Sequence, residues 1–196
     1  YPSIDKPWLK YYSEEALNAP LPEGSMCDYM TACNAGRMDE TALNYFGRKI
    51  THRQLQAEID RCARALVASG VKPGDVVSLC MLAIPEAMYL LYAANKIGAV
   101  VNFLVMSATQ QELRDQLATT ESKLIIMLDI AMPKIKAAAG AARVIPVSLA
   151  QSMPLPAALL YRLKAKQPRA ESTAWQEFLA SGNRVSLPSC TVKKED

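Results

Sequence analysis

The sequence has few of the residues that bind metal ions or form disulfides. Of its 196 residues only His52 is a histidine, and there are five cysteines, Cys27, Cys33, Cys62, Cys80 and Cys190. An odd cysteine count without a C-x-x-C pair argues against a disulfide framework, and one histidine cannot complete a Cys/His zinc site. We therefore expect no metal site and reduced cysteines, with Cys62 and Cys80 in the core, as is typical of a cytoplasmic protein.

Long hydrophobic runs and charge of one sign are also lacking. The longest apolar run, Ala87 to Ala94, is far shorter than the roughly 18 residues that cross a bilayer, and no signal-peptide pattern is present. The formal net charge is only +3, with scattered basic residues, whereas a nucleic-acid surface needs a clustered basic face. With 51% hydrophobic residues, the composition predicts an ordered globular protein that does not bind nucleic acid.

Glycine is scarce as well, with eight copies. The sequence contains no G-x-G-x-x-G, no G-x-x-x-x-G-K-[ST] and no G-x-S-x-G, so the common phosphate cradles and the nucleophile elbow are absent. By pattern alone, no residue is predicted to be catalytic.

Hydrophobic periodicity does predict a fold. Apolar runs at 75–82, 99–106, 123–129 and 142–149 are typical of buried strands. Helical patterns separate them, and the one at 84–98 is apolar nearly all round. This alternation predicts an α/β protein with a mostly parallel sheet covered by helices on both faces.

Three segments follow from this pattern. Residues 1–40 are predicted to be a helical amino-terminal segment that includes a proline-rich stretch, and residues 41–150 the parallel α/β core, opened by a hairpin at 41–51. Residues 151–196 are predicted to hold an amphipathic helix, a short helix around Trp175 and a polar tail.

His52 has a structural explanation in the segment "KITHRQL". Thr51-x-x-Gln54 fits a capping box, in which the threonine oxygen accepts a first-turn amide and the glutamine side chain reaches back. His52 would then be the first residue of a helix, and no nucleophile motif lies nearby. We expect a structural or surface role for it.

Ligands of parallel sheets usually bind beyond the carboxyl ends of the strands. Here those ends fall near Leu82–Ala83, Val105–Ser107 and Asp129. Asp75, in "KPGD", is predicted to be a turn residue, whereas Asp129 lies at the ligand edge.

A resemblance adds to this interpretation. "TALNYFGRKITHRQL" and the following stretch through "NKIGAVVN" resemble the amino-terminal region of AMP-forming acyl-CoA synthetases. "KITHRQL" is similar to the family's Leu-Thr-Tyr-x-Glu-Leu motif, with Ile50, His52 and Gln54 as departures. Lys96, Gly98 and Ala99 match its second motif, Lys-x-Gly-Ala. The opening "SIDKPWLKYY" and the later "SMPLPAALLYRLKAK" resemble bacterial long-chain ligases.

The resemblance implies a two-step reaction for a parent enzyme. A carboxylic acid, most simply a fatty acid, attacks ATP with Mg²⁺ assistance to give an acyl-adenylate and pyrophosphate, and the thiol of coenzyme A then displaces AMP. The family's phosphate loop and catalytic lysine belong to later regions and have no counterpart in this sequence. The chain by itself is therefore expected to be inactive, to hold no cofactor tightly and to have the rest of the ligase as its partner.

The resemblance also implies where coenzyme A would pass. The segment after the second motif's strand borders the family's pantetheine tunnel, which corresponds to Val105, Met106 and Ser107, although "MSATQQEL" departs from the small residues and proline common there. Lys134 and Lys136 could meet the coenzyme's phosphates. The alternatives are a strand end that packs on a helix and a solvated basic face.

The predicted helix from Pro154 to Lys166 has an apolar side, with Leu155, Leu159, Leu160 and Leu163, and cationic Arg162, Lys164 and Lys166. It could bind a membrane peripherally or pack on the rest of the ligase. Exposed apolar surface could also make the chain a homodimer.

Two other functions remain open from the sequence. One is a stand-alone interaction module derived from such a ligase. The other is a flavodoxin-like nucleotide-binding domain, which would retain a flavin or nucleotide after purification.

Overall fold

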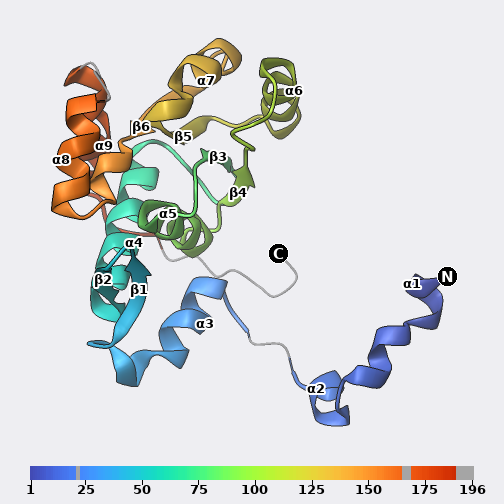
Figure 1. Cartoon of the computed structure of the whole chain (residues 1–196). Coiled ribbons are helices and arrows are strands. Elements are labelled where there is room, and N and C mark those ends of the chain that lie inside the picture. Colours follow the sequence, from blue (N-terminus) through green and yellow to red (C-terminus); the bar gives the residue numbers. More distant parts are fainter. Residues whose placement is uncertain (21–22, 165–168, 189–196) are drawn as a thin grey trace.

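The computed structural model describes residues 1–20, 23–164 and 169–188. It is an α/β fold around a four-stranded parallel sheet (Figure 1). Cys190, Lys166 and residues 189–196 of the predicted polar tail lie outside the described residues. The strands are β1 (Thr41–Tyr45), β2 (Arg48–Thr51), β3 (Val76–Cys80), β4 (Val100–Phe103), β5 (Leu124–Leu128) and β6 (Arg143–Val147).

The α-helices are short at the amino terminus and longer around the sheet. They are α1 (Pro2–Asp5), α2 (Glu14–Asn18), α3 (Met26–Cys33), α4 (His52–Ala68), α5 (Pro85–Lys96), α6 (Gln110–Thr120), α7 (Met132–Ala138), α8 (Leu155–Lys164) and α9 (Arg169–Ser181). The 3-10 helices in the described part of the chain are η1 (Pro7–Tyr11), η2 (Ala35–Arg37), η3 (Asp129–Ala131) and η4 (Leu149–Gln151).

The sheet confirms the predicted fold class. Its strand order is β4-β3-β5-β6, and every neighbouring pair is parallel. The predicted hairpin is also present, since β1 pairs with β2 antiparallel as a separate two-stranded sheet. Strand β4 is shorter than the apolar run at 99–106 suggested, because it lies at the edge of the sheet, where Val100 and Phe103 are about half exposed.

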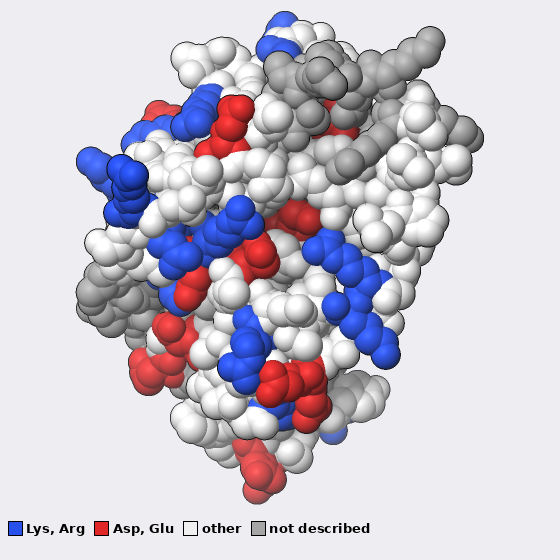
Figure 2. All heavy atoms as spheres, turned by 90° about the vertical axis from the view of Figure 1, so that its left-hand side faces the viewer, with Lys and Arg blue, Asp and Glu red and all other residues white. Residues whose placement is uncertain are grey.

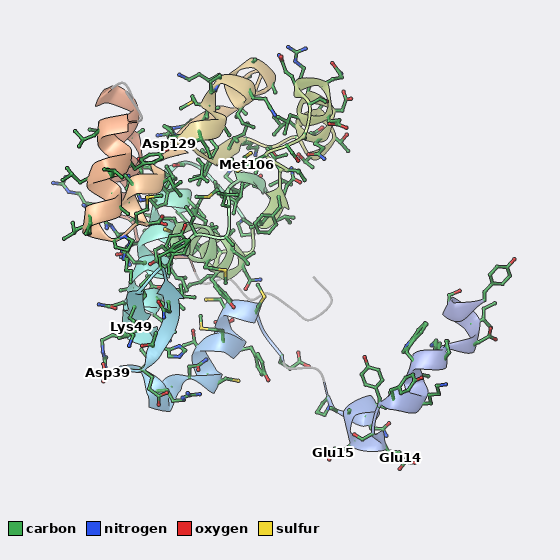
Figure 3. All side chains as sticks on the ribbon, in the orientation of Figure 1. Glu14, Glu15, Asp39, Lys49, Met106 and Asp129 are labelled. Carbon is green, nitrogen blue, oxygen red and sulfur yellow. The ribbon has the colours of Figure 1, made fainter. Side chains whose placement is uncertain are left out.

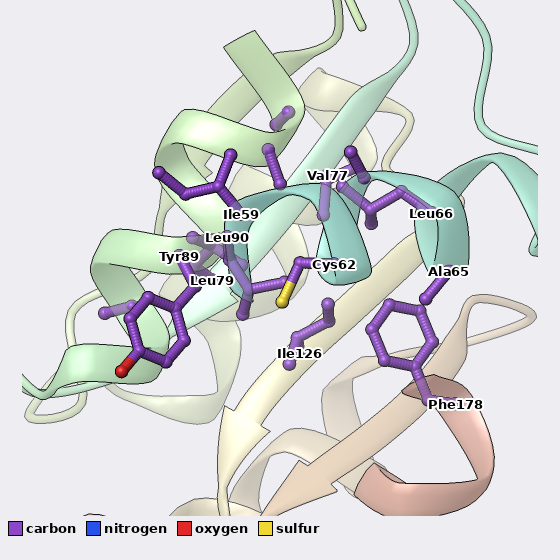
Figure 4. Packing of buried hydrophobic residues seen from close by; sticks show 14 of the residues in the cluster. Ile59, Cys62, Ala65, Leu66, Val77, Leu79, Tyr89, Leu90, Ile126 and Phe178 are labelled. Carbon is purple, nitrogen blue, oxygen red and sulfur yellow. The ribbon is translucent and has the colours of Figure 1, made fainter. Parts of the chain in front are cut away.

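Helices cover both faces of the sheet. Alternate residues of β5 separate the faces, because Leu124, Ile126 and Leu128 belong to one core cluster while Ile125 and Met127 belong to the other. The first cluster joins the sheet to α4, α5 and α9 (Figure 4), and the second joins it to α6 and α7.

Among the described residues, capping boxes begin α3, α4 and α6, and the one at α4 is the box predicted beside His52. The N–H of Gln54 donates to Thr51 Oγ1 at 3.2 Å, and the N–H of Thr51 donates to Gln54 Oε1 at 2.9 Å. The same pattern holds at Thr109 and Glu112 for α6. His52 is the first residue of α4, as predicted, and its Nδ1 is buried without a hydrogen-bond partner among the described residues.

Helix α9 closes the core from the far end of the chain. Trp175, Phe178 and Leu179 are buried in the first cluster, and Gly182, directly after the helix, lies against the backbone of α4. A Cβ at Gly182 would come within 2.6 Å of the Ala65 nitrogen. Only glycine allows this close approach of chain segments.

The amino-terminal residues are arranged differently. Residues 1–20, which include α1, η1 and α2, extend away from the sheet and its helices (Figure 1), and the described side chains of this arm are exposed. Helix α3 returns to the body and packs on α5, where the N–H of Cys27 donates to Asn95 Oδ1 at 2.8 Å. Cys27, Cys33, Cys62 and Cys80 are free thiols.

Candidate functional site: the carboxyl edge of the sheet

The carboxyl ends of β3, β4, β5 and β6 meet at one edge of the sheet because the strands are parallel. In the strand order β4-β3-β5-β6, strand β4 follows β3 in the chain and lies on one side of it, whereas the later strand β5 lies on its other side. The connections therefore diverge between β3 and β5, and in open α/β sheets ligands bind in the crevice at such a switch point. The segments that follow these strands make this edge the candidate site.

A buried carboxylate lies beside this edge at the start of α5. Pro85 is the first residue of this helix, and Glu86 beside it is only 4% exposed. The hydroxyl of Ser152, itself fully buried, donates to Glu86 Oε2. The bond links the segments that follow β3 and β6, on either side of β5.

A second buried carboxylate, Asp129, follows β5 directly. The hydroxyl of Tyr161 on α8 donates to Asp129 Oδ1 at 3.0 Å, while Oδ2 is buried without a partner among the described residues. Burial and the bond to Asp129 raise the pKa of Tyr161 to about 12. Figure 3 shows Asp129 between α8 and the sheet. Each buried acid is thus bonded to a hydroxyl of the segment after β6.

The structure brings together some of the residues predicted to lie near coenzyme A. Met106 is in the turn after β4, between the exposed Val105 and Ser107. The ammonium of Lys134 on α7 donates to the carbonyls of Met106 at 3.1 Å and Ala108 at 2.9 Å. This lysine fastens the turn to α7.

Lys136 lies two residues further along α7 and is exposed. Asp75, by contrast, has the predicted turn role: its carboxylate accepts the N–H of Lys72 and forms an ion pair with Lys123 at 2.8 Å. These two bonds, the one from Lys123 first, lower the pKa of Asp75.

The sequence analysis missed Glu86, Ser152 and Tyr161. One signal was available, since Glu86 is the only acidic residue in a helix that is otherwise apolar nearly all round. Such a carboxylate must be buried with a partner, because burying an isolated charge is costly. Ser152 and Tyr161 carry no comparable signal, because their partners are 66 and 32 residues away in sequence.

The apolar side of α8 is uncovered in this chain. Leu155, Leu159, Leu160 and Leu163 are 87%, 62%, 58% and 72% exposed, and the side chains of Arg162, Lys164 and Lys166 lie outside the described residues. Within the described part of the chain, no helix is both long and apolar enough to cross a membrane. On the face that forms the left side of Figure 1, acidic and basic side chains are interspersed (Figure 2).

Together, the parallel strand order and the helices on both faces of the sheet define a doubly wound α/β protein. Comparison with known proteins makes this more specific. The family model of the AMP-binding enzymes matches residues 30–188, most of the chain. The chain belongs to the AMP-binding enzyme family.

Relatives and solved structures agree with this membership. The chain is 28% identical over 166 residues to a long-chain-fatty-acid–CoA ligase of Bacillus subtilis, covering 83% of this chain and 30% of the relative. It is 33% identical over 153 residues to an acetyl-coenzyme A synthetase of Emericella nidulans, covering 76% of this chain and 22% of the relative.

The fold matches that of a crystal structure of an anthranilate CoA ligase in complex with anthranoyl-AMP. The TM-score is 0.69 at 17% identity, and the match covers 88% of this chain and 30% of that one. The fold is that of the amino-terminal subdomain of such ligases. This chain spans less than a third of the length of these three proteins.

Proposed function

We propose that this chain is the amino-terminal portion of an AMP-forming ligase. The whole enzyme would activate a carboxylic acid with ATP to an acyl-adenylate and transfer the acyl group to coenzyme A. The family match over residues 30–188 is the observation that carries the proposal. The sheet edge with its two buried carboxylates, Glu86 and Asp129, is where a ligand of this fold would approach.

We propose a fatty acid as the substrate. The support is the long-chain ligase relative, whose match extends over 166 residues. An acetyl-coenzyme A synthetase matches over 153 residues, so acetate is the alternative substrate to compare in a test.

We also propose a cytoplasmic location for the protein, which fits the free thiols of the described cysteines.

ATP and Mg²⁺ would be held by the parts of the enzyme that this chain does not span. Among the described residues, no group of three His, Cys, Asp or Glu side chains could hold a metal ion, and the sequence has no phosphate loop. The 196-residue chain should therefore show no ATP–pyrophosphate exchange.

Coenzyme A would pass the turn of Val105, Met106 and Ser107. The carbonyls of Met106 and Ala108 already hold the Lys134 ammonium, so Lys134 positions the turn. Lys136 is exposed two residues further along α7, and we propose that it meets a phosphate of the coenzyme. In the whole ligase, Lys136→Glu should raise the KM for coenzyme A severalfold and leave pyrophosphate exchange unchanged, since exchange needs no coenzyme.

The leucines of α8 would be covered by the rest of the ligase. The alternative is a membrane surface, and a liposome flotation assay separates the two. Binding of the purified chain to anionic vesicles, abolished by Leu159→Glu, would favour the membrane.

A chimera tests the proposed activity directly. Residues 30–188 replace the aligned segment of the Bacillus subtilis long-chain ligase, with the unaltered ligase as the control. The chimera should catalyse ATP–pyrophosphate exchange with palmitate and much less with acetate. A folded chimera without exchange on either acid would contradict the proposal.

The size of the native protein tests the same proposal independently. An antibody against this chain should detect a protein about three times its mass of 21.5 kDa in the source cells, because the chain covers 30% of its long-chain relative. A band at 21.5 kDa would favour the interaction module.

A further inference from the structure

A polar cleft opens between the hairpin, α4, α5, η4 and α9. It has a volume of about 200 Å³, and a neighbouring recess of about 170 Å³ shares Arg48, Glu58 and Tyr89 with it. The residues that line it lie between Arg48 and Leu179 in the sequence, so the cleft exists only in the folded chain.

Two deeply buried polar groups line this cleft with unused hydrogen-bonding capacity. Glu86 is 4% and Tyr89 3% exposed. Among the described residues, Glu86 accepts one bond, from Ser152, and forms no ion pair, and the Tyr89 hydroxyl makes no hydrogen bond. Burial and the charge of Glu86 raise the pKa of Tyr89 well above its usual value, so its hydroxyl remains a donor. Among the described residues Glu86 has no ion-pair partner, and a cationic ligand group in the cleft would supply one.

The cleft also presents positive charge. Arg48 donates one N–H to the carbonyl of Gln151 at 2.8 Å, and a guanidinium has five donors in all. Arg61 lies 3.8 Å from Glu58 in a loose, partly exposed ion pair. Two arginines and two glutamates thus line one small space.

This mixture of positive and negative side chains restricts which kinds of ligand can bind in the cleft. A simple anion would meet the carboxylates of Glu58 and Glu86, and a simple cation would meet Arg48 and Arg61. A small molecule with one charge of each sign satisfies both sets. Trp175 and Leu179, both buried, add an apolar wall.

We propose that this cleft binds a small zwitterion of the α-amino acid class. Its ammonium group is matched to Glu86 and Glu58, its carboxylate to Arg48, and an apolar or amide side chain to the wall of Trp175 and Leu179. Binding of this kind would connect the hairpin, α5 and α9 through one ligand.

Calorimetric titration of the 196-residue chain tests the proposal with defined probes. L-leucine and L-glutamine are the zwitterions. 3-Methylbutylamine and 4-methylpentanoate are L-leucine without its carboxylate and without its ammonium group. At least one of the two amino acids should bind. If L-leucine binds, its two single-charge analogues should bind at least tenfold more weakly than L-leucine does.

Variants locate the binding in the cleft. Glu86→Gln keeps the shape and removes the charge, and it should weaken binding at least tenfold. Glu177→Gln, an exposed acid on α9 outside the cleft walls, should bind as the unaltered chain does. If Glu86→Gln does not fold, Arg48→Gln on the exposed hairpin replaces it, with the same expected loss.

Three results would overturn the proposal. One is the absence of binding by both amino acids at about 10 mM, where a Kd of 1 mM would already be near saturation. Another is equal binding of L-leucine and 4-methylpentanoate, which would show that only the carboxylate is recognised. The third is unchanged binding in the folded Glu86→Gln or Arg48→Gln variant.

Discussion

The hydroxyl of Tyr161 donates a hydrogen bond to Oδ1 of Asp129 across 3.0 Å, joining α8 to the carboxyl end of β5. Helix α8 presents exposed leucines, so this polar bond is a specific link between the helix and the sheet edge. The buried acid in turn depends on the tyrosine, because its other oxygen has no partner among the described residues.

Removing this hydroxyl should loosen α8. Tyr161→Phe is expected to lower the free energy of unfolding by about 1–3 kcal/mol, because it leaves the buried Asp129 carboxylate without a hydrogen-bond partner among the described residues. Urea denaturation measures the change. Tyr12→Phe, on the exposed arm, is the control and should have no measurable effect. Equal stability of the two variants would show that the bond is energetically neutral.

Stability should also fall at high pH. The pKa of Tyr161 is raised to about 12 by burial first and by its bond to Asp129 second, whereas an unfolded tyrosine titrates near 10. The neutral form is therefore favoured in the folded state. Its contribution is fully present below about pH 10 and is lost as the pH rises toward 12.

Urea denaturation at a series of pH values measures this loss. Tyr89, whose pKa is also raised, contributes in the same direction. Tyr161→Phe should therefore reduce the loss without abolishing it. A Tyr161→Phe variant with the same pH dependence as the unaltered chain would contradict the assignment.

Gly182 should not tolerate a side chain. The added Cβ of Gly182→Ala would lie 2.6 Å from the nitrogen of Ala65, and backbone atoms of α4 cannot move aside easily. We expect a loss of about 2–3 kcal/mol, typical of overpacking. Thermal unfolding monitored by circular dichroism measures it. The control is Gly36→Ala, where nothing lies within 4 Å of the new Cβ; similar melting of both variants would refute the contact.

Lys134 should hold the turn after β4. Its ammonium donates to the carbonyls of Met106 and Ala108, and the N–H of Ala108 donates to the carbonyl of Val105 at 3.0 Å. In Lys134→Met, hydrogen exchange at the Ala108 amide should become faster as the turn opens more often. Lys72→Met, at an exposed lysine in another turn, is the control. Unchanged exchange at Ala108 would mean that the turn holds its shape without the lysine.

The uncovered leucines should make the isolated chain self-associate. Sedimentation velocity is expected to show a concentration-dependent dimer, because exposed apolar patches promote association. The double variant Leu159→Glu and Leu163→Glu should remain monomeric with an unchanged melting temperature, since both leucines are more than half exposed. A wild-type chain that stays monomeric at all concentrations would contradict this prediction.

Local signals predicted much of the fold because they act over a few residues. The capping box at Thr51 and the apolar run of β5 each depend on neighbours in sequence, and each was found as predicted. Strand β4 was predicted too long because an apolar run does not reveal that its strand lies at a sheet edge. Likewise, the predicted helix around Trp175 begins earlier, at Arg169.

The carboxyl edge could be predicted only in outline. The ends of the strands and Asp129 followed from the periodicity. The bonds of Glu86 to Ser152 and of Lys134 to the turn at Met106 join residues 66 and 28 positions apart, and no pattern in one sequence specifies such pairs.

The sequence by itself determined the fold class, the start of α4 and the family, because hydrophobic period, capping and ordered motifs are properties of short stretches of chain. Only the tertiary structure decided which buried acids have hydroxyl partners, which lysine is held by carbonyls and where the mixed-charge cleft lies. Those relationships arise when five separate elements pack together, and the geometry of packing is set by the whole core.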